Sequence, residues 1–311
     1  MYANSKGLKY LHGVEVYLTA ALEPKQRDNY HTILIAKNFE GVKEINTLVD
    51  LSTQSDHMYY KPRITFDEFF NISDNVIKIS ACLASPLSKY PNFIGKLVDE
   101  KIVELEKKIY KETEANKLYA ELNSEAAKEA WIEDFAAIYN TSYEIYVEQC
   151  IEKSNNAFDL QIEEAKSELE NAKIVYDKLM KTYDYYEIQP HVKSMDQIRY
   201  NKMLYEASKK YNKPLIAGTD THSIDSYKAE CRSVLQKAKH IEFSNEDEFD
   251  LTYKSYDELV DMFRQQGSLP MDVVLEAIEN TNRMADSVTD YELDTAFKYP
   301  ILYDNEEEVF V

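Results

Sequence analysis

The chain has 311 residues, of which 44% are hydrophobic, and its formal net charge is −20 at pH 7. This length is typical of one large α/β unit or of two smaller domains. A surface with so much negative charge repels phosphate backbones, so we expect DNA to be contacted only weakly or indirectly. No apolar run could span a bilayer and the N-terminus lacks the features of a signal peptide, which predicts a cytoplasmic protein without membrane contact. Cys82, Cys150 and Cys231 are odd in number and far apart, which fits a reducing compartment.

Short apolar segments alternate with amphipathic helical patterns along most of the chain. We expect strands at 13–20, 31–38, 76–84, 185–191 and 214–220, and helices at 40–51, 195–212, 226–239 and 271–288. A further helix is expected to end at Gly267. The alternation predicts an α/β fold with a parallel sheet, either doubly wound or closed into a barrel. In the helix over 226–239, the apolar pattern predicts that Cys231 faces the core.

One long stretch interrupts this alternation. Between Lys96 and Gln189 there is no glycine or proline, and Glu, Lys, Ala and Leu dominate, which is typical of long helices with i,i+4 charge pairs. We divide the chain into a first α/β part (1–95), a helical insertion (96–182), a second α/β part (183–245) and a C-terminal helical part (246–311). The insertion is either a solvated spacer or a docking arm for a partner, and the sequence alone favours the spacer.

The apolar segment before Asp220 raises the question of a functional site. In parallel α/β folds, functional groups lie at or just beyond the carboxyl ends of strands. Side chains alternate along an extended segment, so Asp220 and His222 point to the same side and could bind one divalent ion. On the preceding predicted strand, Glu187, Gln189 and His191 also share one face.

Three more residues extend this set of candidates. Glu15 lies inside an apolar strand, where an unpaired carboxylate is costly, while His31 opens a strand and Cys82 follows one. Oxygen, nitrogen and sulfur donors together suit zinc, manganese or iron better than calcium. Each also has a purely structural explanation: Glu15 could pair with a lysine, His31 could bond to backbone, Asp220 could cap a helix, and Cys82 could be a small buried apolar side chain.

Six segments, in their order along the chain, resemble a known family. They are GLKYLHGVEVYL, YHTILIAKNFEGVKEINTLV, YYKPRITFDEF, VIKISACLASPL, YYEIQPHV and PLIAGTDTHSID. In this order they resemble the PHP (polymerase and histidinol phosphatase) domain of bacterial DNA polymerase III alpha subunits. The C-terminal part, 246–311, resembles the stretch that leads from this domain into the polymerase core.

The resemblance implies a distorted (β/α)7 barrel with up to three metal ions at its strand ends. It also implies a metal-dependent phosphoesterase or 3′–5′ exonuclease activity and, as partners, the other parts or subunits of a replicative polymerase. The alternative is a non-catalytic module that supports the polymerase or binds a partner through the helical insertion. Carried over block by block, the metal ligands would be Glu15, His31, Cys82, His191, Asp220 and His222; no catalytic residue is assigned.

This sequence departs from the family pattern at its start. The family begins with an H-x-H motif followed by a T-D-H block, and neither occurs here. About two βα units are therefore missing, so we expect an N-terminally incomplete barrel with an exposed sheet edge. Either an upstream portion is absent or the chain is a relative that has lost catalysis, and we expect weak or no activity from this chain alone.

Overall fold

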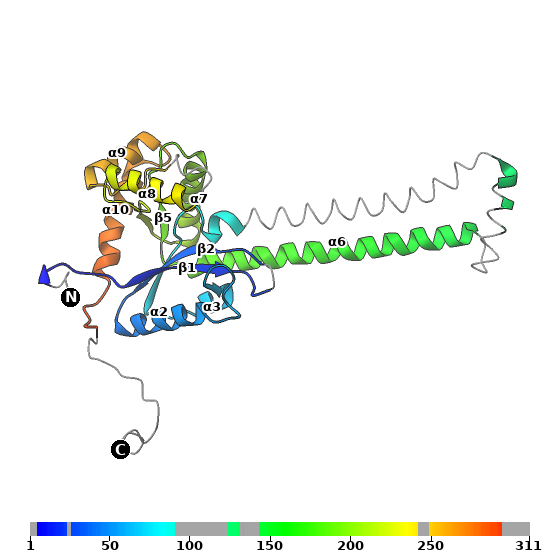
Figure 1. Ribbon diagram of the computed structural model, residues 1–311, viewed down its shortest axis with the longest axis horizontal. Helices are drawn as coiled ribbons and strands as arrows, with labels where there is room; N and C mark the ends of the chain where they lie inside the picture. Colours follow the sequence, from blue (N-terminus) through cyan, green and yellow to red (C-terminus); the bar gives the residue numbers. More distant parts are fainter. Residues whose placement is uncertain are drawn as a thin grey trace, which may run out of the picture.

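The computed structural model describes residues 5–23, 26–90, 124–127, 129–130, 133, 143–241 and 249–293 (Figure 1). Their strands are β1 (Gly13–Thr19), β2 (Tyr30–Ala36), β3 (Arg63–Thr65), β4 (Val76–Ile79), β5 (Tyr186–Ile188) and β6 (Leu215–Ala217). The principal helices are α2 (Phe39–Ser52), α3 (Phe66–Phe70), α6 (Tyr143–Thr182), α7 (Met195–Tyr211), α8 (Ser226–Ala238), α9 (Tyr256–Gln266) and α10 (Met271–Asp286). The five predicted strands and the five predicted helices are confirmed, whereas β3 and α3 were not predicted.

The strands form a mixed sheet rather than a parallel one. Their order is β3-β1-β2-β4 in one sheet and β5-β6 in a second. β1 pairs with β3 and β5 with β6 in parallel, but β2 is antiparallel to both β1 and β4. The prediction of an all-parallel sheet is wrong here because the link between β1 and β2 is too short to hold a crossover helix. In the part of the chain that is described, the strands do not close into a barrel.

The two sheets meet where the end of β4 lies beside the start of β5. Ile79 and Tyr185 form an isolated parallel bridge, and the Ser80 amide donates to the Tyr185 carbonyl at 3.2 Å. Just before them, the Asp184 amide donates to the Lys78 carbonyl at 2.8 Å, and the Asp184 side chain accepts from the Lys78 amide at 2.9 Å. These bonds join segments that lie on opposite sides of the insertion in the sequence.

One hydrophobic core runs through both sheets. Leu18, Leu34, Tyr186, Ile188 and Leu204 belong to it and are all fully shielded from solvent. On the opposite face of the strands, a smaller apolar cluster brings β4 and β6 against α10. Because both faces of these short strands are buried, their sequences are continuous runs of apolar residues.

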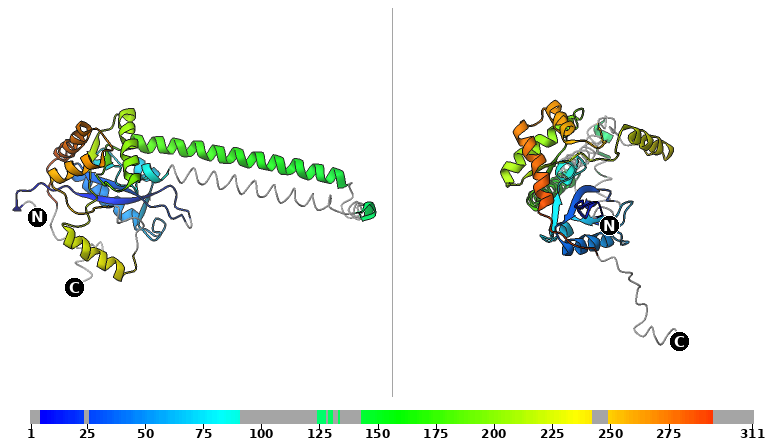
Figure 2. Two further views of the ribbon diagram at one scale, coloured as in Figure 1. Left: turned by 90° about the horizontal axis from the view of Figure 1, so that it is seen from above. Right: turned by 90° about the vertical axis from the view of Figure 1, so that its left-hand side faces the viewer.

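Part of the predicted insertion is a single long helix. α6 spans 40 residues, which corresponds to a length of about 60 Å, and it extends away from the sheets (Figures 1 and 2). At its C-terminal end, Leu179 and Met180 are buried in the core, so this end belongs to the α/β body. Most of the preceding residues, 91–123 and 134–142, lie outside the described residues, and the docking role stays a prediction. No described helix has the length and apolar content that crossing a bilayer requires.

His57 forms a buried ion-pair arrangement beside α3. Its Nδ1 lies 2.8 Å from Asp56 Oδ1 and its Nε2 lies 2.8 Å from Glu68 Oε1, so both ring nitrogens face carboxylates. An imidazole that donates from both nitrogens carries a positive charge. Burial alone would lower the pKa of His57, but the hydrogen bonds to Asp56 and Glu68 outweigh it and raise this pKa.

We predict that this arrangement makes the stability of the fold depend on pH. Because the His57 pKa is raised in the folded state, its contribution is complete below the unfolded pKa of about 6.5 and is lost as pH rises through the folded pKa. His57→Gln should lower the free energy of unfolding at pH 6 by about 1–3 kcal/mol and reduce the loss of stability above that pH. Urea unfolding at a series of pH values measures both effects. Equal pH profiles for the two proteins would contradict the prediction.

Candidate metal centre

Glu15 and His31 meet on one face of the first sheet. In the antiparallel register, Tyr17 lies opposite His31 and Glu15 opposite Ile33, so Glu15 and His31 are diagonal neighbours. The distance between Glu15 Oε1 and His31 Nδ1 is 2.8 Å. The hydrogen bond from His31 lowers the pKa of Glu15, although burial opposes the shift, and the charge of nearby His222 adds to it. Glu15 is therefore an ionised carboxylate at neutral pH.

Cys82 lies next to this pair. Its Sγ is 3.7 Å from His31 Nδ1, and it follows Ala81, whose φ of +58° is unusual for a residue with a side chain. Burial raises the pKa of the Cys82 thiol to about 12, and the charges of Asp220, Glu15 and Glu187 act in the same direction. Without a cation nearby, Cys82 is a protonated thiol rather than a reactive thiolate.

Asp220 and His222 lie beyond the end of β6, in a segment that is not extended. His222 Nε2 is 3.3 Å from Asp220 Oδ1, and both side chains are partly exposed. The amide of His222 donates to the carbonyl of Leu251 at 2.8 Å, which ties this segment to the stretch before α9. Asp220 has a φ of +48°, so the backbone adopts a strained, left-handed conformation at this position.

His191 is the most unusual of the six candidates. It is only 1% exposed, and neither of its ring nitrogens has a hydrogen-bond partner among the residues that the structure describes. Its ring packs edge-on against Phe249, with ring centres 4.8 Å apart. Burial lowers the pKa of His191 to about 4, so the imidazole is neutral and keeps a free lone pair at physiological pH. A buried donor and acceptor without partners are costly, which points to a ligand at this position.

A network of buried amides fixes the backbone on which His191 lies. Gln266 Nε2, from the end of α9, donates to the carbonyls of Gln189 and His191 at 3.0 and 2.9 Å. Asn201 Nδ2, from α7, donates to the Gln189 carbonyl and to Gln266 Oε1, both at 2.8 Å. These bonds hold the segment after β5 rigidly, while the His191 ring itself remains unsatisfied.

Glu187 was placed on the face of His191 by the sequence reasoning, but it was not among the predicted metal ligands. It is buried, and burial raises its pKa to about 7 while a 2.7 Å hydrogen bond from Gln189 partly offsets the shift. Gly218 makes room for it, because a Cβ at Gly218 would lie 2.1 Å from Glu187 Oε1. The signal that could have found it is a carboxylate inside an apolar strand, on the same face as His191.

Asp220 links the two groups of candidates. After the larger effect of burial, its charge raises the pKa of Cys82, Glu187 and His191. Glu15, His31 and Cys82 thus lie together, with Glu15 inside β1 and His31 near the start of β2, while Asp220 and His222 form a second pair beyond β6. As the side chains stand, however, no three His, Cys, Asp or Glu residues of the described ranges are arranged to hold a metal ion. The donor set and the unsatisfied His191 fit a divalent metal, although the ligands are not preassembled.

Comparison with known families adds an independent observation. Residues 1–125 match the family model of the PHP domain. The resemblance to PHP domains is thereby confirmed. This match includes Glu15, His31 and Cys82, whereas His191, Asp220 and His222 lie beyond it.

The similarity to full-length proteins extends over nearly the whole chain. DNA polymerase III subunit alpha of Borreliella burgdorferi is 26% identical over 317 aligned residues, which cover 97% of this chain and 20% of that protein. DNA polymerase III subunit alpha of Aquifex aeolicus is 28% identical over 131 residues, covering 39% of this chain and 11% of that protein. The chain therefore spans about a fifth of the length of the first relative.

We predict that Glu187 destabilises the metal-free fold above neutral pH. Its pKa of about 7 compares with an ordinary value of 4.5, so the folded state holds this proton more tightly than the unfolded state. Stability is therefore lost as pH rises from about 4.5 to 7, by about 3 kcal/mol at an energy of 1.36 kcal/mol per pKa unit. Glu187→Gln should remove this loss, because its amide is neutral at every pH.

Denaturant unfolding in EDTA at pH 5 and pH 8 measures the effect. Relative to the wild-type chain, Glu187→Gln should be more stable at pH 8 than at pH 5. Glu276→Gln is a suitable control, because Glu276 is an exposed glutamate on α10. If both substitutions changed the pH profile equally, the account of Glu187 would be wrong.

Proposed function

We propose that this chain acts as the PHP-domain part of a bacterial-type replicative DNA polymerase III alpha subunit. The single observation that carries the proposal is the similarity to such a subunit over 97% of the chain. Its partners would then be the other parts or subunits of a replicative polymerase, in the cytoplasm. The mixed sheet, continued through the β4–β5 junction into β5 and β6, supports an incomplete form of the (β/α)7 barrel rather than a doubly wound sheet.

We further propose that the strand ends bind a divalent metal, with zinc, manganese or iron as the candidates. Glu15, Asp220 and His222 would hold it, with His31, Cys82 and His191 completing the set of donors. A bound metal would bind phosphate oxygens and lower the pKa of a water molecule. In its absence, the carboxylates of Glu15 and Asp220 are paired with His31 and His222.

A second candidate function is a non-catalytic module that supports the polymerase. One observation favours it over a phosphoesterase: the described side chains do not form a ready metal cluster. Both functions are compatible with a bound metal ion. They differ in turnover, because only a phosphoesterase hydrolyses a phosphate ester.

We predict that the EDTA-treated chain binds Zn²⁺ or Mn²⁺ in isothermal titration calorimetry. Asp220→Ala/His222→Ala should weaken this binding roughly tenfold or more, because it removes two ligands from one side of the site. The matched control is His12→Ala/Asp286→Ala, which removes a histidine and an aspartate away from the strand ends. Equal binding by the two double variants, or no binding by the wild-type chain, would contradict the metal site.

Hydrolysis of bis(p-nitrophenyl) phosphate separates the two functions. Our proposal expects little or no turnover by the metal-loaded chain. Metal-dependent turnover that Asp220→Ala/His222→Ala abolishes and the control retains would instead identify a phosphoesterase.

A further inference from the structure

Helix α8 exposes its apolar face to solvent. Tyr227, Cys231, Val234 and Leu235 follow one another at helical spacing and share this face, which Ala238 continues. All are exposed, with relative exposures of 66% for Tyr227 and 62% for Val234. The prediction that Cys231 faces the core is therefore wrong. An amphipathic helix forms as predicted, but its apolar stripe, here called the α8 face, is turned outwards.

The helix also lacks the packing that the other long helices near the sheets have. None of its residues is buried, and it makes no extensive contact with another strand or helix of the described ranges. Both views in Figure 2 show α8 standing apart from the sheets and from α9 and α10. A set of large apolar side chains on one such helix marks an interaction site.

The charges beside the α8 face are opposite to those of the whole chain. Between Ser226 and Ile241 there are three exposed lysines, Lys228, Lys237 and Lys239, and one acidic side chain, Glu230. The chain as a whole carries a net charge of −20. The partner that fits this helix therefore has an apolar surface bordered by carboxylates.

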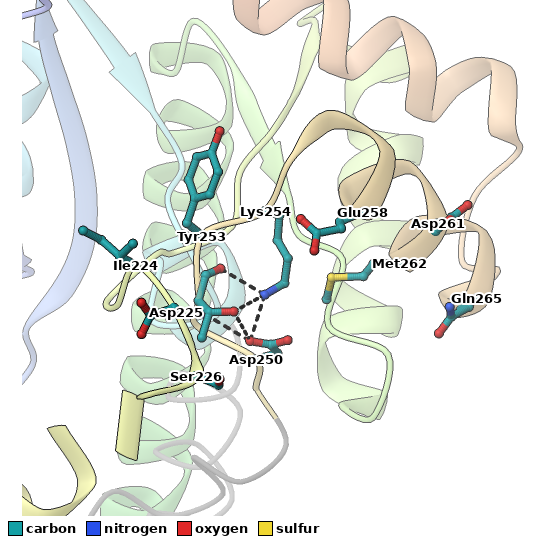
Figure 3. A pocket seen from close by; sticks show the side chains of 11 residues that line it. Ile224, Asp225, Ser226, Asp250, Tyr253, Lys254, Glu258, Asp261, Met262 and Gln265 are labelled. Carbon is teal, nitrogen blue, oxygen red and sulfur yellow. Dashed lines mark hydrogen bonds and ion pairs between the residues drawn. The ribbon is translucent and has the colours of Figure 1, made fainter. Parts of the chain in front are cut away.

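The same chain carries such a surface directly beside the start of α8. A groove of about 660 Å³ lies between the segment after β6 and helix α9 (Figure 3). Ile224, Tyr253 and Met262 supply its apolar part. Four carboxylates line it, from Asp225, Asp250, Glu258 and Asp261. Asp250 is paired with Lys254 at 2.9 Å and Asp261 is paired with Arg264. The net negative charge of the groove therefore comes from Asp225 and Glu258, which cap the starts of α8 and α9.

We infer that the α8 face docks into the acidic groove of a second copy of this chain. The basic helix α8 and the acidic groove lie side by side on one copy. When a second copy is turned by a two-fold rotation, each of these surfaces can meet the opposite surface of the other copy. In such a pair, α8 of each copy would lie against the groove of the other, and two equivalent contacts would form. An α8–α8 contact is disfavoured, because it would bring two basic helices together.

The overall negative charge does not prevent this association. At physiological ionic strength the Debye length is about 8 Å, so charges far from the interface are largely screened. Charges at the contact are opposite in sign and act at short range. The groove adjoins the segment that carries His222, because Ser223 forms a bridge with Thr252. The inference still does not depend on the proposed function, since the contact that it describes needs no metal ion.

Sedimentation velocity of the whole chain over a range of concentrations tests the inference. We expect a reversible dimer, with a dissociation constant that Val234→Glu/Leu235→Glu raises at least tenfold. Leu160→Glu/Ile174→Glu is the matched control: both residues lie on α6 and each is 65% exposed. A wild-type chain that stays monomeric, or a dimer that both variants weaken equally, would overturn the inference.

Charge reversal tests which surfaces meet. One variant carries Lys228→Glu/Lys237→Glu on α8, and the other carries Asp261→Lys/Gln265→Lys in the groove. Each variant alone should be monomeric, since both of its contacts join like charges. A mixture of the two should form a heterodimer, because both contacts then join opposite charges. No association in the mixture would overturn the inference, and circular dichroism of each variant verifies that it is folded.

Discussion

The hydrogen bonds between β4 and β5 are the constraint on which the rest of the structure depends. The segments that they join are separated in the sequence by the whole helical insertion, yet Ser80 and Tyr185 are bonded directly at 3.2 Å. The Ser80 side chain also accepts from the Glu187 amide at 2.9 Å. Through this junction, the sheet that carries Glu15 and His31 is aligned with the sheet that leads to His191 and Asp220. Without it, the candidate ligands would belong to two unrelated surfaces.

The same junction places polar groups where solvent cannot reach them. Burial shifts the pKa values of two of these groups in opposite directions. It raises the pKa of Glu187 to about 7 and lowers the pKa of His191 to about 4. In both cases the neutral form is favoured, because an isolated buried charge is costly. A bound divalent cation would favour the ionised form of Glu187 and would accept the lone pair of the His191 imidazole. The metal-free arrangement is therefore a compromise, in which the amide network around Gln266 holds the backbone while the His191 ring stays unsatisfied.

The sequence predicted local structure better than the arrangement of the strands. Periodicity and caps were enough for α7 and α9, and the apolar runs were enough for β1 and β2, because these signals are local. Strand direction depended on the length of the β1–β2 link, and the short β3 has no pattern of its own. At the site, Asp220 and His222 do lie together, but through a left-handed backbone at Asp220 rather than through the alternation of an extended segment. Glu187 was placed on the face of His191 but not among the ligands, because its burial depends on Gly218 and on the distant Ser80. Similarly, the pattern of α8 identified an apolar face but could not show that this face lies in solvent.

The central claim is that the strand ends on both sides of the β4–β5 junction form one metal-binding region. Anomalous diffraction from crystals of the chain soaked in Zn²⁺ or Mn²⁺ tests it most directly. The account predicts a peak at about 2.0–2.2 Å from a ring nitrogen of His191 or His222, with a carboxylate of Asp220 or Glu15 also in contact. A peak bound only by surface residues elsewhere, or no peak at saturating metal, would contradict it.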